Sequence, residues 1–336
     1  MRHALFAAVA ASALAALAPG HVQATPSYAF TTLDDPSASP DGAGTRALGI
    51  NAAGQIVGYY QSSGLEHGFL RDASGTFTSF DDPSGPGTTE PAGINGRGQI
   101  VGLYLGGPGV EHGFLRDAKG NFTTIDHPSG PNFTLAYGIN DAGQIVGFYR
   151  DGVGRHGYLR DASGNFITLD DPSGTGSTST TASGINNAGQ IVGDYQDAVS
   201  PVHAFLRDPA GTFTTLDDPS GRFGTEAYGV NAAGQIVGFF LASSGFLASS
   251  GAPHGFLRDA SGTFTTLDDP SATDGTFAYG INNAGQIVGS YDDNAGSHGF
   301  LATPIAAAVP EPASLAVLGA GLLGVGGLGV RRRGTA

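Results

Sequence analysis

The chain repeats one pattern of about 45 residues six times, and this repeat restricts the fold more than any other feature. Three phrases recur in a fixed order with small variations: FTTLDDPS, GINNAGQIVGFY and HGFLRD. The first glycines of successive second phrases are 44, 45, 46, 45 and 51 residues apart, and a tandem FLASSG at residues 240–251 accounts for the longest interval. A period in this range is too short for independent domains and is typical of propeller blades.

Each repeat is expected to form four short β-strands. In the last repeat, residues 278–281 lead through an Asn-Asn-Ala-Gly turn into residues 286–291, which is the pattern of a β-hairpin. The HGFLRD phrase leads into the FTTLDD phrase through a second turn. Adjacent apolar residues such as Ile287 and Val288 favour a sheet that is covered on both faces. Because residues 25–309 show no helical period, the predicted class is all-β.

The two ends of the repeat region predict how the fold closes. A lone copy of the last strand occupies residues 28–33, whereas the sixth repeat stops after its third strand, near residue 301. One strand and three strands would complete the sixth blade. We therefore expect residues 25–305 to form a six-bladed β-propeller of four-stranded blades, closed by the N-terminal strand pairing with the last three strands. A parallel β-solenoid is the alternative, but it would not need this split.

The repeat resembles the extracellular HAF repeat family. The His-Ala-Phe phrase that gives this family its name stands at residues 203–205, and the other repeats read His-Gly-Phe or His-Gly-Tyr. The resemblance covers nearly all of residues 28–301 and implies an extracellular repeat protein without a defined activity.

Residues 1–24 have the pattern of a secretory signal peptide. Arg2 precedes an apolar stretch that is too short for a membrane span, and small residues stand before the expected cleavage by signal peptidase after Ala24. A buried N-terminal helix is the alternative. The chain has no cysteine, so an exported domain would be stabilised by its own core without disulfides.

The C-terminal segment, residues 306–336, consists of a linker and a three-part tail. Pro310, Glu311 and Pro312 precede eighteen uncharged residues, 313–330, and Arg331, Arg332 and Arg333 follow them. Eighteen residues are about the minimum for a transmembrane helix. The tail resembles the PEP-CTERM sorting signal, which implies processing by an exosortase-type enzyme and delivery to the bacterial cell envelope, surface or extracellular matrix. The protein would then meet the membrane only through this segment, before processing. A plain C-terminal anchor is the alternative.

The charge balance bears on the partners. Residues 25–309 contain 11 bases and 28 acids, a net charge of -17. This excess of acids argues against nucleic acid and favours divalent cations or basic partners.

Paired acids are the only candidate metal ligands. An Asp followed by Pro often caps a turn. Carboxylates are also ligands for calcium, which is the candidate cofactor of this chain. The weak candidates are Asp34, Asp35, Asp81, Asp82, Asp170, Asp171, Asp217, Asp218, Asp268 and Asp269. The six repeat histidines are interpreted as structural donors to loop or backbone carbonyls.

Two features locate a binding surface. The loops after the second and fourth strands of each blade emerge on one face, which holds all the length variation and is here called the variable-loop face. Departures from the repeat at Glu90, His127 and Asp194 are where catalysis would be sought, but no nucleophile is paired with them.

These patterns favour an exported, non-catalytic surface or matrix protein that binds or scaffolds through the acidic variable-loop face, with extracellular polysaccharide as a partner. The alternative is a secreted propeller enzyme, a hydrolase or lyase, acting on polysaccharide. A scaffold without any small ligand is a third reading.

Overall fold

The computed structural model describes residues 27–39, 44–174, 179–197, 201–242 and 251–305, and all regular secondary structure in them is β-strand. The expected all-β class is therefore confirmed. No helix in these described ranges is long and apolar enough to cross a membrane. The expected cleavage site, membrane helix and sorting residues lie outside the described residues.

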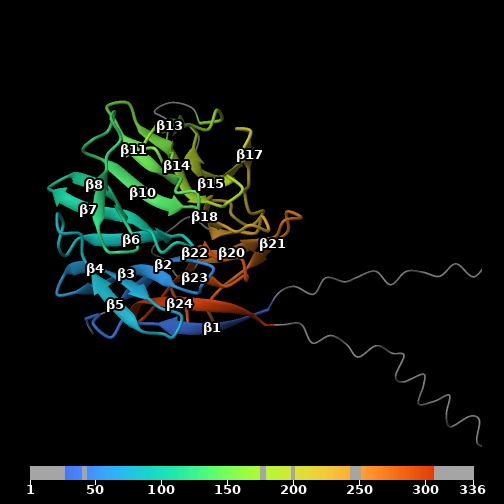
Figure 1. The fold of residues 1–336 in the computed structure, drawn as a ribbon. Helices are drawn as coiled ribbons and strands as arrows, with labels where there is room; N and C mark the ends of the chain where they lie inside the picture. The colour runs from blue at the N-terminus through green and yellow to red at the C-terminus, as the bar shows by residue number, and fades with distance from the viewer. Residues whose placement is uncertain (1–26, 40–43, 175–178, 198–200, 243–250, 306–336) are drawn as a thin grey trace, which may run out of the picture. The chain divides into compact units, whose positions relative to one another are not determined.

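Each repeat forms a unit of strands in which consecutive strands pair antiparallel (Figure 1). The strands of units 1 to 3 are β2 (Thr45–Ile50), β3 (Ile56–Ser62), β4 (Leu65–Arg71), β5 (Phe77–Phe80), β6 (Thr89–Ile94), β7 (Ile100–Gly107), β8 (Val110–Arg116), β9 (Phe122–Ile125), β10 (Thr134–Ile139), β11 (Ile145–Arg150), β12 (Arg155–Arg160) and β13 (Phe166–Leu169). Those of units 4 to 6 are β14 (Ser179–Ile185), β15 (Ile191–Gln196), β16 (Val202–Arg207), β17 (Phe213–Thr215), β18 (Gly224–Val230), β19 (Ile236–Leu241), β20 (Pro253–Arg258), β21 (Phe264–Thr266), β22 (Gly275–Ile281), β23 (Ile287–Asp293), β24 (Gly296–Ile305) and β1 (Ser27–Leu33).

The sheets keep the units distinct. Units 1 and 2 are separate four-stranded sheets, and the N-terminal strand joins the last three in the order β1-β24-β23-β22 (Figure 1). Units 3, 4 and 5 count as one twelve-stranded sheet because single parallel pairs, Arg155 with Ser179 and Val202 with Gly224, join them at one end. The first strands, β2, β6, β10, β14, β18 and β22, contact one another in this order, and β22 also contacts β2.

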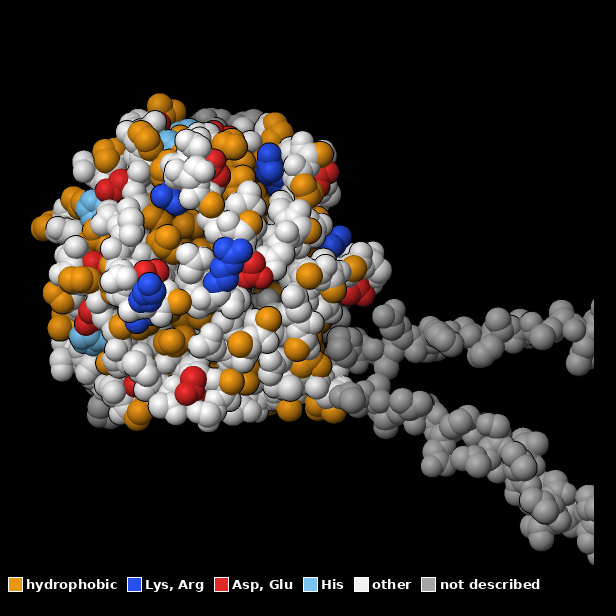
Figure 2. Space-filling model, in the orientation of Figure 1, with side chains coloured by type: hydrophobic (Ala, Val, Ile, Leu, Met, Phe, Trp, Pro, Cys, Tyr) orange, Lys and Arg blue, Asp and Glu red, His pale blue; other side chains and the backbone are white. Residues whose placement is uncertain are grey.

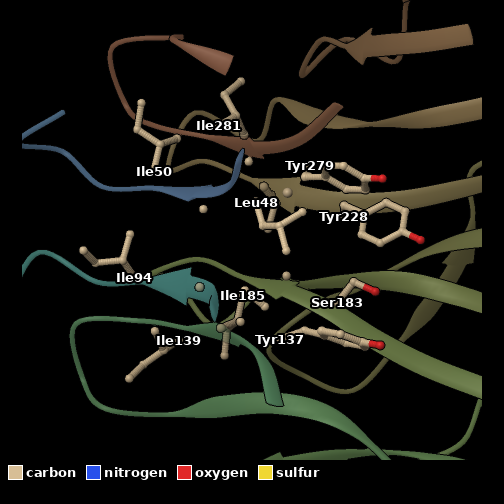
Figure 3. Close-up of a pocket in the computed structure, with 18 of the residues that line it drawn as sticks. Leu48, Ile50, Ile94, Tyr137, Ile139, Ser183, Ile185, Tyr228, Tyr279 and Ile281 are labelled. Carbon is tan, nitrogen blue, oxygen red and sulfur yellow. The ribbon is translucent and has the colours of Figure 1, made fainter. Parts of the chain in front are cut away.

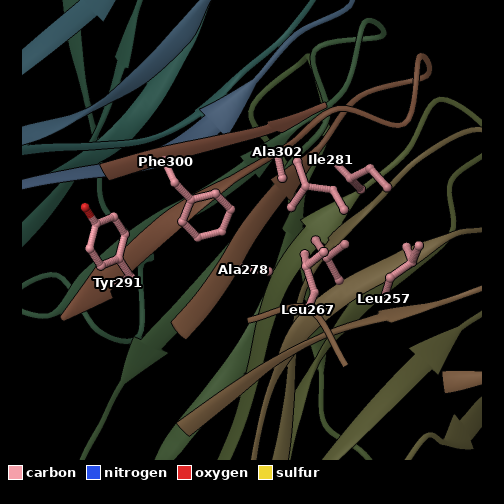
Figure 4. Packing of buried hydrophobic residues seen from close by; sticks show 9 residues of the cluster. Leu257, Leu267, Ala278, Ile281, Tyr291, Phe300 and Ala302 are labelled. Atoms are coloured by element: carbon pink, nitrogen blue, oxygen red, sulfur yellow. The ribbon is translucent and has the colours of Figure 1, made fainter. Parts of the chain in front are cut away.

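The core lies between neighbouring sheets. Ile287 belongs to one buried cluster with Leu257 and Leu267 of unit 5, two residues that Figure 4 labels, whereas the adjacent Val288 belongs to another cluster with Leu33 and Ile56. Alternate residues of a strand point to opposite faces, so apolar pairs of this kind bury both faces of a sheet. This explains the unbroken apolar runs in the sequence.

The first strands approach one another so closely that glycine is required on them. A Cβ on Gly184 would lie 2.3 Å from the backbone oxygen of Tyr228 in the next unit. A side chain at this position would push neighbouring units apart.

A ring of asparagines joins the units at the ends of the first strands. Asn186 donates from Nδ2 to the backbone oxygen of Asn231 in the next unit, at 3.0 Å, and its Oδ1 accepts two backbone N–H groups of its own turn. The same inter-unit bond runs in sequence through Asn51, Asn95, Asn140, Asn186, Asn231, Asn282 and back to Asn51. Each asparagine thus holds both a tight turn and the adjacent unit.

We predict that Asn186→Ala lowers the free energy of unfolding by about 2–3 kcal/mol, because buried backbone groups lose their partners. Asn165→Ala, which removes an exposed turn bond to Asp161, should cost less than about 1 kcal/mol. Urea unfolding of both variants checks this prediction. Equal losses in the two variants would contradict it.

Candidate functional site

The repeats differ from one another at three positions of their first two strands. The first strand of every unit reads Thr-x-Ala-x-Gly-Ile, with Pro91 for Ala and Val230 for Ile as exceptions, and the second strand reads Ile-Val-Gly-x. We call the residues marked x the variable positions. They are Arg46, Leu48, Tyr59, Glu90, Ala92, Leu103, Leu135, Tyr137, Phe148, Thr181, Ser183, Asp194, Glu226, Tyr228, Phe239, Phe277, Tyr279 and Ser290.

A β-bulge directs one of these residues in each unit. The register of every first strand shifts between the Ala, or Pro91, and the Gly of this motif, so that the residue between them is unpaired. A bulge re-aims the side chain that it carries. In this way Tyr137, Ser183, Tyr228 and Tyr279 come to line a common space (Figure 3).

The space among the first strands is a cavity of about 250 Å³, here called the central cavity. Charged groups are contributed by Arg46 and Glu90, and Ile50 and Ile94 belong to an apolar girdle further along the strands (Figure 3). The strands then reach the asparagine ring. The polar residues Arg46 and Glu90 stand early in their strands, nearer the variable loops than the asparagines.

A second cavity of about 290 Å³, here called the side cavity, shares Tyr137 and Tyr228 with the central cavity. Its charged residues are Arg155 from β12, Asp194 from β15 and Glu226 from β18. Three consecutive units therefore supply one compact set of ionisable groups.

The two carboxyls of the side cavity lie in an environment that disfavours their ionised forms. Burial raises the pKa of Asp194 to about 8, repulsion from Glu226 adds to the rise, and the Arg155 guanidinium opposes it. Burial also raises the pKa of Glu226, although the Tyr228 hydroxyl donates to its Oε2 at 2.8 Å. Strongly shifted carboxyls in a cavity are typical of functional sites.

Glu90 is a third carboxyl of this kind, in the central cavity. Burial raises its pKa to about 8, and the nearby charges of Glu66 and Glu111 raise it further, whereas Arg46 lowers it. Glu66 also forms a side-chain hydrogen bond with Glu90, which favours a shared proton.

The paired aspartates are the calcium ligands that the sequence predicts. The first and the second Asp of each pair lie in different environments. The first Asp of each pair accepts a hydrogen bond from Nδ1 of a repeat histidine, at 2.7 to 3.1 Å. These pairs are His298 with Asp34, His67 with Asp81, His156 with Asp170, His203 with Asp217 and His254 with Asp268, and Asp126 pairs with His112 in the same way. The expected carbonyl partners of the histidines were therefore wrong, because an acid lies within reach across the hairpin.

The second Asp of each pair is buried and caps the following turn. Its Oδ1 accepts the backbone N–H two residues later, at 2.7 to 2.8 Å. The residues in this position are Asp35, Asp82, Asp171, Asp218 and Asp269. Within the described part of the chain, no group of three or more His, Cys, Asp or Glu is arranged to hold a metal ion. Calcium binding stays a prediction.

The three departures from the repeat, Glu90, Asp194 and His127, lie in different parts of the structure. Glu90 lies in the central cavity and Asp194 in the side cavity. His127 instead replaces a capping Asp, is buried, and stacks on Tyr149 with ring centroids 3.6 Å apart. The sequence motifs do not predict Arg155, Glu226 or the tyrosines as site residues, although part of this set is visible as variation among the six aligned repeats.

The comparison with protein families concerns the C-terminal tail. The model of the PEP-CTERM protein-sorting motif matches residues 308–333. The chain carries a PEP-CTERM sorting motif. This confirms the interpretation of the tail, whose motif is a signal for exosortase processing and marks the protein as exported. No curated protein matches the sequence.

Solved structures resemble the repeat region in fold. AofleA from Arthrobotrys oligospora is 11% identical with a TM-score of 0.51, and the match covers 85% of this chain and 91% of that chain. TolB from Acinetobacter baumannii is 14% identical with a TM-score of 0.50, covering 79% and 65% respectively. Virginiamycin B lyase from Staphylococcus aureus is 10% identical with a TM-score of 0.48, covering 83% and 100%. The first two of these matches indicate a β-propeller-like fold.

The raised pKa values predict how stability depends on pH. Asp194 and Glu90 have a pKa of about 8 in the folded protein, against about 4 in the unfolded chain. Their protonated forms favour folding, so this stability is fully present below about pH 4 and is lost as the pH rises through 8. We expect the Tm to fall between pH 5 and pH 9, less steeply in the Glu90→Gln, Asp194→Asn double variant. Calorimetry showing parallel curves would contradict this.

Proposed function

We propose that the protein is an exported bacterial cell-surface or matrix protein that binds a ligand, without turning it over, in the cavities at its variable-loop face. Signal peptidase would cleave after Ala24, and an exosortase-type enzyme would remove the tail that contains the motif at residues 308–333. The repeats would be of the HAF type. Their six units would be the blades of a closed propeller, an arrangement supported by the asparagine ring and by the sheet that β1 shares with β24.

The proposal rests on the positions at which the repeats differ from one another. Their strands keep the residues that pack or cap, whereas residues that line the two cavities change from unit to unit. A scaffold without a ligand would have no need for six different sets of side chains around its axis. Variation on a constant framework is typical of binding sites.

The cavity chemistry fits a polysaccharide. Ring faces of Tyr137, Tyr228 and Tyr279 offer packing surface for the carbon skeleton of a sugar, and carboxyls and a guanidinium offer partners for hydroxyl groups. Both cavities include residues from the starts of first strands, on the side of the variable loops. The side cavity also includes Ser179 and Gln196, which stand beside those loops.

We expect Tyr137→Leu to weaken the binding of matrix oligosaccharides by about tenfold, because an aromatic contact is lost. The scaffold already accepts leucine at the equivalent position, Leu48, so the fold should persist. The matched control is Tyr195→Phe, outside the cavities, which copies Phe240 of the next unit. Isothermal titration calorimetry measures all three proteins, and equal affinities would contradict the assignment.

A secreted polysaccharide hydrolase or lyase is the second candidate, favoured by the buried pair Asp194 and Glu226. A carboxyl with a pKa near 8 is protonated at neutral pH and is suited to act as a general acid. Incubation of the same oligosaccharides with the protein separates the two functions. Unchanged oligosaccharides support binding, whereas cleavage that is lost in Asp194→Asn supports the enzyme.

We also keep calcium binding at the paired aspartates as a proposal. Because a ligand that prefers the folded state raises the Tm, calcium should raise it above the value in chelator. An unchanged Tm would leave these carboxylates as histidine partners and turn caps.

A further inference from the structure

The side cavity holds two carboxyls and one guanidinium in a space that three units build together. Arg155 donates from Nη1 to Thr181 Oγ1 at 3.2 Å, and its guanidinium lies over the ring of Phe148, 4.7 Å from the centroid. These contacts hold in place the one Arg or Lys among the described residues that line the cavity. Two carboxyls line the same cavity: Asp194 is 9% exposed and Glu226 is half-buried.

The charges in this cavity do not balance. When both carboxyls are ionised, the single guanidinium leaves one negative charge without a partner. The other ionisable groups that face Asp194 are Tyr137 and Tyr228, and neither brings positive charge. Burial and repulsion from Glu226 raise the pKa of Asp194 to about 8, so a proton neutralises this charge at neutral pH. A bound cation would replace that proton.

A buried hydroxyl without a hydrogen-bond partner is a second observation that points to a ligand, and it does not depend on the acids. This hydroxyl lines the central cavity, which adjoins the side cavity. Ser183 is 5% exposed, and its Oγ has no hydrogen-bond partner. The bulge of β14 places it between Tyr137 and Tyr228, the two residues that line both cavities (Figure 3). A buried hydroxyl without a partner costs free energy, which a ligand atom at this position would recover.

The surroundings select the kind of cation. The rings of Tyr137, Phe148 and Tyr228 line the side cavity together with the carboxyls, so aromatic side chains border this space. Aromatic faces and carboxylates together attract organic ammonium groups. A metal ion would lack its usual set of oxygen ligands, because the described residues provide no group of three acids or histidines for it.

On the face shown in Figure 2, acidic and basic side chains lie scattered among uncharged ones. The unbalanced charge of the side cavity differs from these surface charges because Asp194 is buried. The net charge of -17 on residues 25–309 would also attract a cationic ligand from solution.

We propose that the side cavity binds an organic ammonium group between Asp194 and Glu226, with the attached carbon atoms against Tyr137 and Tyr228. The ammonium could be carried by a free amine or by an amino sugar, since both present the same chemistry. The proposal rests on the ligand-binding function proposed above and adds to it the chemical class that this subsite takes.

Choline is a suitable probe because its charge does not change with pH, and 3,3-dimethyl-1-butanol is its neutral counterpart. Calorimetry on the full protein at pH 8 should show binding of choline at least tenfold tighter than that of the alcohol. Because the proton competes with the cation, affinity for choline should fall by up to about tenfold for each pH unit below 8. Equal binding of the two probes, absence of choline binding, or an affinity independent of pH would overturn the proposal.

Variants locate the site. Asp194→Asn and Glu226→Gln keep the side-chain shapes and should each reduce choline affinity at least tenfold. Asp194→Ser copies Ser290 at the equivalent position, and provides a second test if the first variant does not fold. Asp274→Asn removes one exposed charge from a loop and is the matched control. Unchanged choline affinity in the folded Asp194 variants would place the cation elsewhere and overturn the proposal.

Two further measurements distinguish a free amine from an amino sugar as the source of the ammonium, and the ammonium subsite from the proposed binding function as a whole. Putrescine represents a free amine, and glucosamine with N-acetylglucosamine represents an amino sugar with and without its charge. Preference for glucosamine over N-acetylglucosamine would support the sugar source, and tighter putrescine binding would support the free amine. If neutral oligosaccharides bind and no ammonium compound does, the ammonium subsite fails while the proposed binding function stands.

Discussion

The close approach of the first strands around the axis is the constraint on which the structure depends. Glycine is required where these strands meet, since a Cβ on Gly184 would collide with the backbone oxygen of Tyr228, and the asparagine ring holds the strand ends together. Every unit must satisfy the same contacts with the next unit, so the residues that make them recur in all six repeats. Only side chains outside these contacts are free to differ, and the bulges bring one of them per unit to the axis.

This division of roles explains the buried acids. Asp194, Glu226 and Glu90 contribute nothing to the repeated packing, and their burial opposes ionisation. Residues that lower the stability of a fold, and make no packing contact that offsets this loss, are expected at functional sites. The six His–Asp pairs differ in this respect, because they occur in every unit and belong to the framework of the variable-loop face.

Much of the fold follows from the repeat period, since local turns and apolar runs recur and identify the strands. The separate roles of adjacent aspartates were not predictable, because neighbouring residues in an extended segment point in opposite directions and meet different partners. Asp35, for example, caps a turn whereas Asp34 bonds His298, which is distant in sequence. The pairing of Asp194 with Glu226 likewise depends on how units pack. Asp194 itself was identifiable, because the other five repeats carry an aromatic residue, leucine or serine at this position and none carries a charge.

The central claim is that ligand binding occurs where the repeats differ. Amide hydrogen exchange of the protein, measured with and without polysaccharide from its own matrix, tests this claim most directly. The account predicts slower exchange in β10, β14, β15 and β18 beside the two cavities, with the outer strands β13 and β17 unchanged. Protection confined to the outer strands or to the asparagine turns, or no protection at all, would contradict it.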